Sequence, residues 1–110
     1  MAKRSLQEPT FLILTSLAAG PQHGYAIMTD AERISGGHVK LRAGTLYAAL
    51  DRLSADGLVE PDREEVVEGR LRRYYRITGE GAARLAAEAQ RLRANADVAT
   101  SRLRLAGGTA

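Results

Sequence analysis

The sequence contains no cysteine and no tryptophan, and phenylalanine occurs once. Without cysteine, the chain has no disulfide, no thiolate metal ligand and no cysteine nucleophile. With so few aromatic residues, a hydrophobic core has to be built from Leu, Ile, Val and Ala. A chain of 110 residues provides one domain with a modest core. We therefore expect association with a second chain to supplement the core.

Long hydrophobic runs are also absent. The longest, FLILTSLAA, is interrupted by Thr15 and Ser16, whereas a membrane-spanning helix needs about 20 apolar residues. The N-terminus shows no charged start followed by an apolar stretch and a small-residue cleavage site, the pattern of a signal peptide. We therefore expect a cytoplasmic protein that has no membrane partner.

Signals for metal binding and catalysis are missing as well. His23 and His38 lie fifteen positions apart, a poor arrangement for a metal site in a chain without cysteine. The sequence shows no Ser/His/Asp set and no phosphate-binding glycine loop. We expect no catalytic residues, no metal and no cofactor, and we do not expect an enzyme.

Charge is distributed unevenly along the chain. Sixteen Lys and Arg residues against thirteen Asp and Glu residues give a net charge of +3, which by itself is weak evidence for a nucleic-acid partner. Residues 60–68, EPDREEVVE, hold five acids, whereas residues 70–76, RLRRYYR, hold four arginines and no acid. This sorting predicts a β-hairpin whose returning strand is basic.

Periodicity and turn residues give the expected order of elements. The first helix is expected over residues 10–19 and ends at Gly20-Pro21, and the second follows Gly24 and is closed by Ser35–Gly37. A minor strand at 38–41 and a third helix within 41–55 come next. Two strands around a turn near 65–69 follow, and then a long helix that Thr78 caps and that ends near Leu105. On the second helix, Ile27, Ala31 and Ile34 are expected to share the buried face.

Three helices followed by a two-stranded wing predict a mainly α (α+β) fold, namely a winged helix-turn-helix with a long C-terminal dimerisation helix. The expected parts are a flexible N-terminal arm (residues 1–8), a DNA-binding domain (9–77), the dimerisation helix (78–106) and a disordered tail (107–110).

The third helix has one apolar face and one bare face. Leu46, Leu50 and Leu53 follow the i, i+4, i+7 spacing of a buried face. The opposite face carries only small or short residues, namely Gly44, Ala48, Asp51 and Ala55, and the flanks carry Thr45, Arg52 and Tyr47. A bare face lets the backbone approach a groove while the flanking side chains bind phosphates or base edges. The alternative is a solvated helix with alanine filler, and Asp51 either reads a cytosine or merely tolerates the groove.

Two cations lie at the start of this helix. Lys40 and Arg42 oppose the helix dipole there, and no Ser, Thr, Asp or Asn occupies the expected cap position. Both features fit a phosphate that approaches the free N–H groups. The alternative is an exposed arginine that the helix tolerates.

The predicted wing carries Arg70, Arg72 and Arg73 directly after Gly69. A winged helix places these side chains near the DNA backbone, and Tyr74 is expected to face outward with Arg72. Alternatively, the arginines pair with the acids of the other strand on a solvated edge. The acidic wing tip would repel phosphate, so contacts are expected from the arginine end.

The last helix carries a heptad seam. Its members are spaced 4, 3, 4, 3, 4: Leu85, Ala89, Leu92, Ala96, Ala99 and Leu103. Such a seam favours packing against another helix. About 27 residues make a helix of about 40 Å, which is too long for packing on its own domain alone, so we expect a homodimer.

Three blocks in the expected order carry a resemblance. GPQHGYAI (20–27), GTLYAALDRLSADGLV (44–59) and RRYYRITGEG (72–81) resemble the signature blocks of the PadR family of transcriptional regulators. The short length and single C-terminal helix resemble the smaller PadR subfamily. The resemblance implies a cytoplasmic homodimer, usually a repressor, which a small-molecule effector often releases from its operator.

The resemblance also implies roles for individual residues. Thr45, Tyr47 and Arg52 would contact DNA from the recognition helix, and Arg72 and Arg73 would contact phosphates from the wing. Structural roles would fall to His23, Gly24, Tyr25 and Tyr75, with Tyr25 seating the second helix and His23 bonding to nearby backbone. The family often has Ser or Pro just before Gly-Thr-Leu-Tyr, where this sequence has Arg42 and Ala43. No aromatic residue occurs in residues 76–110, which argues against an aromatic-stacking drug pocket between subunits.

Two functions from different classes follow. The first is a dimeric, sequence-specific repressor that binds double-stranded DNA at a pseudo-palindromic operator. The alternative is a winged-helix module that dimerises and binds protein, which the acidic wing tip could suit.

Overall fold

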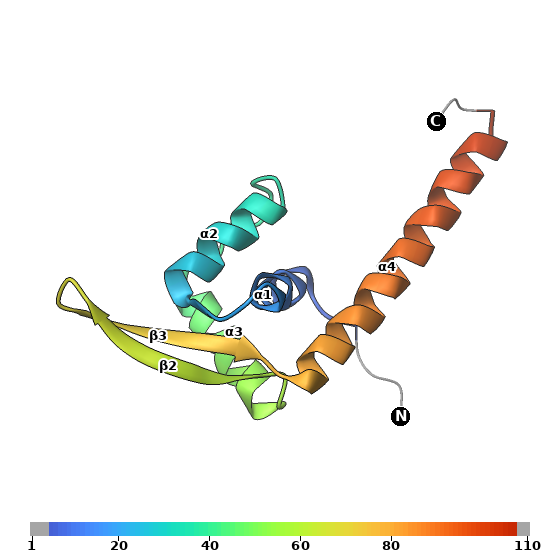
Figure 1. The fold of residues 1–110 in the computed structure, drawn as a ribbon. Helices are drawn as coiled ribbons and strands as arrows, with labels where there is room; N and C mark the ends of the chain where they lie inside the picture. The colour runs from blue at the N-terminus through green and yellow to red at the C-terminus, as the bar shows by residue number, and fades with distance from the viewer. Residues whose placement is uncertain (1–4, 108–110) are drawn as a thin grey trace.

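The computed structural model describes residues 5–107 of the chain (Figure 1). In chain order the elements are α1 (Glu8–Ala18), β1 (Gln22–His23), α2 (Gly24–Ile34), α3 (Ala43–Ala55), β2 (Val59–Val67), β3 (Arg70–Ile77) and α4 (Gly79–Leu105). Three helices, a β-hairpin and a long final helix make up the predicted winged helix-turn-helix, so the predicted fold class is confirmed.

The core lies among α1, α2, α3 and the start of the hairpin. It is built from aliphatic side chains, as the composition predicts: Ile13, Leu14, Leu17, Ile27, Leu46, Ala49, Leu50, Leu53, Leu58 and Val59. Leu46, Leu50 and Leu53 are all buried, which confirms the predicted buried face of α3. This packing holds α3 against the first two helices and leaves its opposite face exposed.

Two local predictions were wrong. The short strand is not at residues 38–41, which form a loop, but at β1, where Gln22 pairs with Tyr75 and His23 with Tyr74. A two-residue strand has no periodicity to detect, because only pairing with β3 defines it. Ile34, expected on the buried face, is 44% exposed. It is the last residue of α2, one turn beyond Ala31 and outside the core cluster.

The first helix begins at Glu8, two residues before the expected start. Pro9 lies in its first turn, where a missing N–H costs nothing. Just before the helix, Leu6 packs on the core. Residues 1–4 of the expected arm and 108–110 of the expected tail lie outside the described residues.

The three strands form one antiparallel sheet in the order β1-β3-β2. Strands β2 and β3 are joined by Glu68 and Gly69, whose φ angles of 51° and 76° define a two-residue turn with two left-handed residues. Pro61 lies on β2, an edge strand, where a residue without a backbone N–H is tolerated. Pro61 pairs with Tyr75 and Glu64 with Arg73, so Asp62 and Arg63 together oppose Tyr74 in a β-bulge.

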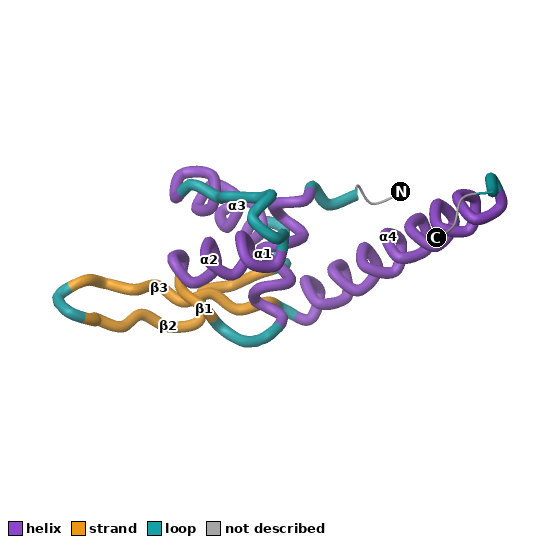
Figure 2. Tube along the Cα trace, turned by 90° about the horizontal axis from the view of Figure 1, so that it is seen from above, coloured by secondary structure: helices purple, strands orange, loops and turns teal. Residues whose placement is uncertain are grey.

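The elements α1 to β3 form the head of the molecule. Helix α4 leaves the head on the side opposite the hairpin (Figures 1 and 2). Thr78 caps it as predicted, because its hydroxyl oxygen accepts a hydrogen bond of 3.0 Å from the Gly81 N–H. Every residue from Ala89 to Gly107 is exposed. The described chain therefore measures 60 × 34 × 21 Å along its principal axes, with most of α4 uncovered. Within residues 5–107, no helix has the length and apolarity that crossing a membrane requires.

One carboxylate is buried where α4 passes the N-terminal segment. Glu88 is 6% exposed and accepts hydrogen bonds from Arg91, including one of 3.2 Å from Nε. The Arg91 hydrogen bond, together with the Leu6 backbone N–H, lowers the pKa of Glu88. This contact links the segment before α1 to α4, and no sequence motif indicated it.

Candidate nucleic-acid interface

A groove of about 440 Å³ lies between the wing and the helices. It is lined by His23, Gly24, Tyr25, Tyr47, Arg70, Leu71, Arg72 and Arg73. Strand β1 pairs only with Tyr74 and Tyr75. Strand β2 pairs with the other edge of β3. In the described part of the chain, the edge of β3 that faces away from β2 is therefore unpaired from Arg70 to Arg73. This open edge forms the wing side of the groove.

Gly24 allows α3 to pack closely against the start of α2. A Cβ at Gly24 would lie 2.3 Å from the Tyr47 hydroxyl oxygen and 2.9 Å from its Cζ, so a side chain there would displace the Tyr47 ring. The structure thereby explains the glycine of the His-Gly-Tyr block. Tyr25, which the resemblance implied would seat α2, is 66% exposed and lines the groove.

His23 does not bond to nearby backbone as expected. It precedes α2 without a side-chain capping hydrogen bond. Because β1 pairs with β3, its ring packs edge-on against Tyr74, with centroids 5.3 Å apart and planes at 81°. Burial, followed by the charge of Arg72, lowers the pKa of His23. His23 therefore helps to attach the wing to the helices.

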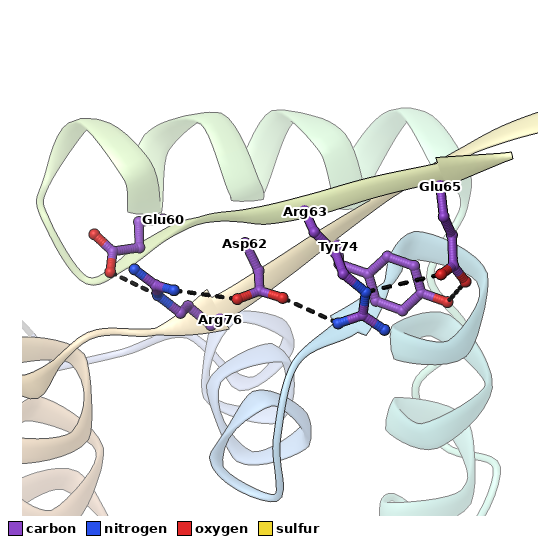
Figure 3. Close-up of polar contacts among 6 residues, drawn as sticks. All are labelled: Glu60, Asp62, Arg63, Glu65, Tyr74 and Arg76. Atoms are coloured by element: carbon purple, nitrogen blue, oxygen red, sulfur yellow. Dashed lines mark hydrogen bonds and ion pairs between the residues drawn. The ribbon is translucent and has the colours of Figure 1, made fainter.

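The outer face of the sheet carries a row of paired charges (Figure 3). The Arg76 Nε lies 2.8 Å from Glu60, and the Arg76 Nη1 lies 3.1 Å from Asp62. Asp62 is also 3.0 Å from the Arg63 Nη1. The bulge explains this row, because it shifts the alternation of β2 so that Asp62 and Arg63 both lie beside Tyr74.

Tyr74 takes part in the same row. It lies on the outer face as predicted, but it is covered: the Arg63 guanidinium lies 3.9 Å from its ring centroid. Its hydroxyl donates a hydrogen bond of 2.6 Å to Glu65. Glu65 is the residue opposite Arg72 in the strand register, and its carboxylate accepts the hydrogen bond of Tyr74 and forms no ion pair with Arg72.

The wing arginines therefore divide into two groups. Arg73 pairs with Glu64 at 3.4 Å, and Arg76 with Glu60 and Asp62. Among residues 5–107, Arg70 and Arg72 form no ion pair, and Arg70 lies opposite Val67. Pairing across the hairpin, one of the two alternatives for the wing, therefore holds for Arg73 and Arg76 but not for Arg70 and Arg72, whose uncompensated charge lies at the groove.

The outward face of α3 is bare, as predicted. Gly44, Ala48, Asp51 and Ala55 are all exposed. Arg42 is the residue before the helix, with extended backbone and no side-chain capping hydrogen bond. Lys40 and Arg42 are exposed, and neither forms an ion pair with any described residue. The N-terminus of α3 thus presents free cations.

The two flanks of α3 face different surroundings. Tyr47 lies beside the wing groove, whereas Arg52 lines a separate cavity of about 500 Å³ with Asp56, Arg84 and the segment at residues 5–10. Thr45 is exposed on the same flank as Arg52 by helical geometry. The structure therefore does not bring Arg52 to the wing arginines. Sequence reasoning missed Leu71 and Arg84, which only the tertiary arrangement brings beside these cavities.

The predicted seam of α4 also divides. Leu85 is half-buried and packs on the core of its own chain. The other five members, Ala89, Leu92, Ala96, Ala99 and Leu103, are exposed, and Leu103 is 68% exposed. An apolar stripe thus continues beyond the part of α4 that the head covers. No group of three or more potential metal ligands gathers within the described residues.

Three helices, a three-stranded sheet with a protruding hairpin and a basic groove beside α3 define a winged-helix protein. Residues 13–87 match the model of the transcriptional regulator PadR-like family. Because that match covers more than half of the chain, the chain belongs to the PadR-like family. Members of this family are transcriptional regulators and not enzymes.

Sequence relatives extend the same conclusion. The chain is 41% identical over 73 residues to the transcriptional regulator Rv3488 of Mycobacterium tuberculosis, covering 66% of this chain and 64% of that protein. It is 52% identical over 54 residues to an uncharacterised 37.1 kDa protein in transposon TN4556 of Streptomyces fradiae, covering 49% of this chain and 15% of that protein. The chain thus spans less than two thirds of both relatives.

Solved structures share the fold. A PadR family transcription regulator from Clostridium difficile superposes with a TM-score of 0.71 at 27% identity, covering 88% of this chain and 99% of that one. Bacillus subtilis PadR, solved in complex with operator DNA, superposes with a TM-score of 0.65 at 21% identity, covering 74% of this chain and 46% of that one.

Proposed function

We propose that this regulator is a cytoplasmic homodimer that binds a pseudo-palindromic operator and represses transcription. The observation that carries the DNA-binding part is the pair of uncompensated arginines, Arg70 and Arg72, beside the Tyr47 groove, where other wing arginines are paired. Unpaired guanidinium groups on an exposed edge are suited to phosphate. The operator complex of Bacillus subtilis PadR supports the same use of a similar fold.

The contacts that we propose follow from where each side chain lies. In the winged-helix domain (residues 9–77), α3 would enter the major groove with its bare face toward the bases. Phosphate contacts would come from two places, the wing and the start of α3: Arg70, Arg72 and Arg73, and Lys40 and Arg42. Thr45, Tyr47 and Arg52 would contact base edges or backbone from the two flanks of α3. Arg73 would exchange its ion pair with Glu64 for phosphate.

The experiment that tests DNA binding is the salt dependence of the affinity. For a selected operator, the logarithm of the association constant measured by fluorescence anisotropy is expected to fall linearly with the logarithm of salt concentration, by about 0.9 per phosphate contact. Arg42→Ala with Arg52→Ala is expected to weaken binding and flatten the slope. Salt-independent binding, or an unchanged affinity of the double variant, would favour the protein-binding alternative.

Dimerisation would use the exposed part of the helix at residues 78–106. The head covers only the start of α4, and the apolar stripe from Ala89 to Leu103 is open. A partner helix would bury it, and the alanines would allow close approach. Two heads on such a dimer would address half-sites about one turn of DNA apart.

Leu92→Glu is expected to convert the dimer to monomer, because it places a charge in the middle of the proposed seam. Sedimentation velocity measures this directly. Gln90→Glu is the control, since it adds the same charge to an exposed residue about 140° from the seam by helical geometry and should leave the dimer intact. A Leu92→Glu protein that still sediments as a dimer would place the interface elsewhere.

A further inference from the structure

Asp51 is the only ionisable side chain on the bare face of α3, where Gly44, Ala48 and Ala55 are its neighbours along the ridge. It is exposed, and with the described residues it forms no hydrogen bond and no ion pair. The carboxylate therefore has no evident part in holding the fold. Among the four residues of the bare face, Asp51 also has the longest side chain, and it extends clearly beyond the helix backbone.

The charge of Asp51 acts on the groove side of α3. Burial raises the pKa of Tyr75, followed by the influence of Tyr47, and Asp51 adds to the same shift. Tyr75 packs on the core beneath the wing. By helical geometry Asp51 lies about 40° around α3 from Tyr47, which lines the groove beside the wing, so Asp51 lies at the side of the bare face nearest that groove.

A carboxylate at this position has a defined effect on DNA recognition. If the bare face enters the major groove, Asp51 loses water and approaches base edges between two rows of phosphates. The N7 and O6 of guanine and the O4 of thymine are acceptors and repel it. Adenine presents its N6 amino donor next to the N7 acceptor, which also repels a carboxylate, whereas cytosine presents the N4 amino donor without an acceptor on its own major-groove edge. Loss of hydration is compensated only where such a donor is present.

We propose that Asp51 is a specificity-determining residue that selects cytosine at one position of each operator half-site. This inference rests on the proposed DNA-binding function and adds the base that the helix reads. Lys40, Arg42 and the wing arginines would supply affinity that is independent of sequence, while Asp51 would reject sites with an acceptor at its position. Rejection of the wrong base is expected to be about tenfold or more in affinity.

The test is selection from a randomised double-stranded DNA library with the full chain and with its Asp51→Asn and Asp51→Ala variants. The natural protein is expected to enrich cytosine at one position of each half-site. Asp51→Asn is expected to move that preference to adenine, because an amide binds adenine N6 and N7. Asp51→Ala is expected to flatten it, with the other positions unchanged. Circular dichroism verifies that the variants fold.

Asp56→Asn is the matched control, since it removes a carboxylate from the end of the same helix, outside the bare face, and should leave the consensus unchanged. A clear consensus that neither Asp51 variant alters would overturn the role of Asp51 while leaving the proposed function standing. Failure of the natural protein to enrich any sequence would overturn specific DNA binding, and the reading of cytosine with it.

Discussion

Replacing Arg70 and Arg72 together with alanine is expected to weaken operator binding at least about tenfold at moderate salt. Neither arginine has an ion-pair partner among the described residues. Both positive charges are therefore available to phosphate in the natural protein, and alanine removes them. Removal of each arginine that touches a phosphate should also reduce the steepness of the salt dependence by about 0.9. Anisotropy titrations at several salt concentrations measure both quantities, and the weakening should be similar for specific and non-specific DNA.

The control for this pair removes the same charge elsewhere. Arg33 and Arg76 are each already paired, with Asp30 and with Glu60, and both lie outside the groove. Alanine at these two positions lowers the net charge equally and should change affinity only slightly. Equal weakening in the two double variants would mean that net charge, and not the groove, governs binding.

Gly81→Ala is expected to destabilise the fold by about 3 kcal/mol, the upper part of the usual range for overpacked sites. A Cβ there would lie 2.0 Å from the Leu58 carbonyl oxygen and 2.8 Å from the Ile77 Cγ1. The carbonyl cannot easily yield, because it accepts a hydrogen bond of 3.0 Å from the Thr78 N–H. Denaturant unfolding at a fixed protein concentration measures the change in the free energy of unfolding.

Gly79→Ala provides the matched comparison in the same turn of α4. A Cβ at Gly79 meets nothing within 4 Å, and alanine has the better helix propensity, by up to about 1 kcal/mol. This variant should therefore be as stable as the natural protein or more stable. If Gly81→Ala were equally harmless, the close packing of α4 on the Leu58 carbonyl would be contradicted.

Much of the fold could be predicted because local patterns report it. The leucines at positions 46, 50 and 53 predicted the buried face of α3, since residues at this spacing share one side of any helix. Thr78 predicted the cap of α4, because capping needs only a hydroxyl next to the first turn. The change in period after Gly57 and the sorted charges predicted the hairpin. These signals lie within short stretches of chain.

The candidate site could be predicted only in part. Strand β1 has two residues and exists through pairing with β3, so no local pattern marks it. The roles of the wing arginines depend on the bulge at Asp62 and Arg63, which a strict alternation of strand residues does not anticipate. Gly24 belonged to a recognised block, but its contact with Tyr47 becomes visible only when α2 and α3 are packed together.

By itself, the sequence determined the four helices and the hairpin, the aliphatic core, the bare face of α3, the basic returning strand and the PadR-like membership, because each depends on residue spacing or on blocks of residues. The tertiary structure decided which charges remain free. It placed Tyr74 on Glu65, the residue opposite Arg72, and it placed Val67 opposite Arg70. Among the described residues, both arginines are left without ion-pair partners beside Tyr47. The physical reason is that ion pairing depends on distances of a few ångströms between strands, and the register that sets those distances is formed only when the chain folds.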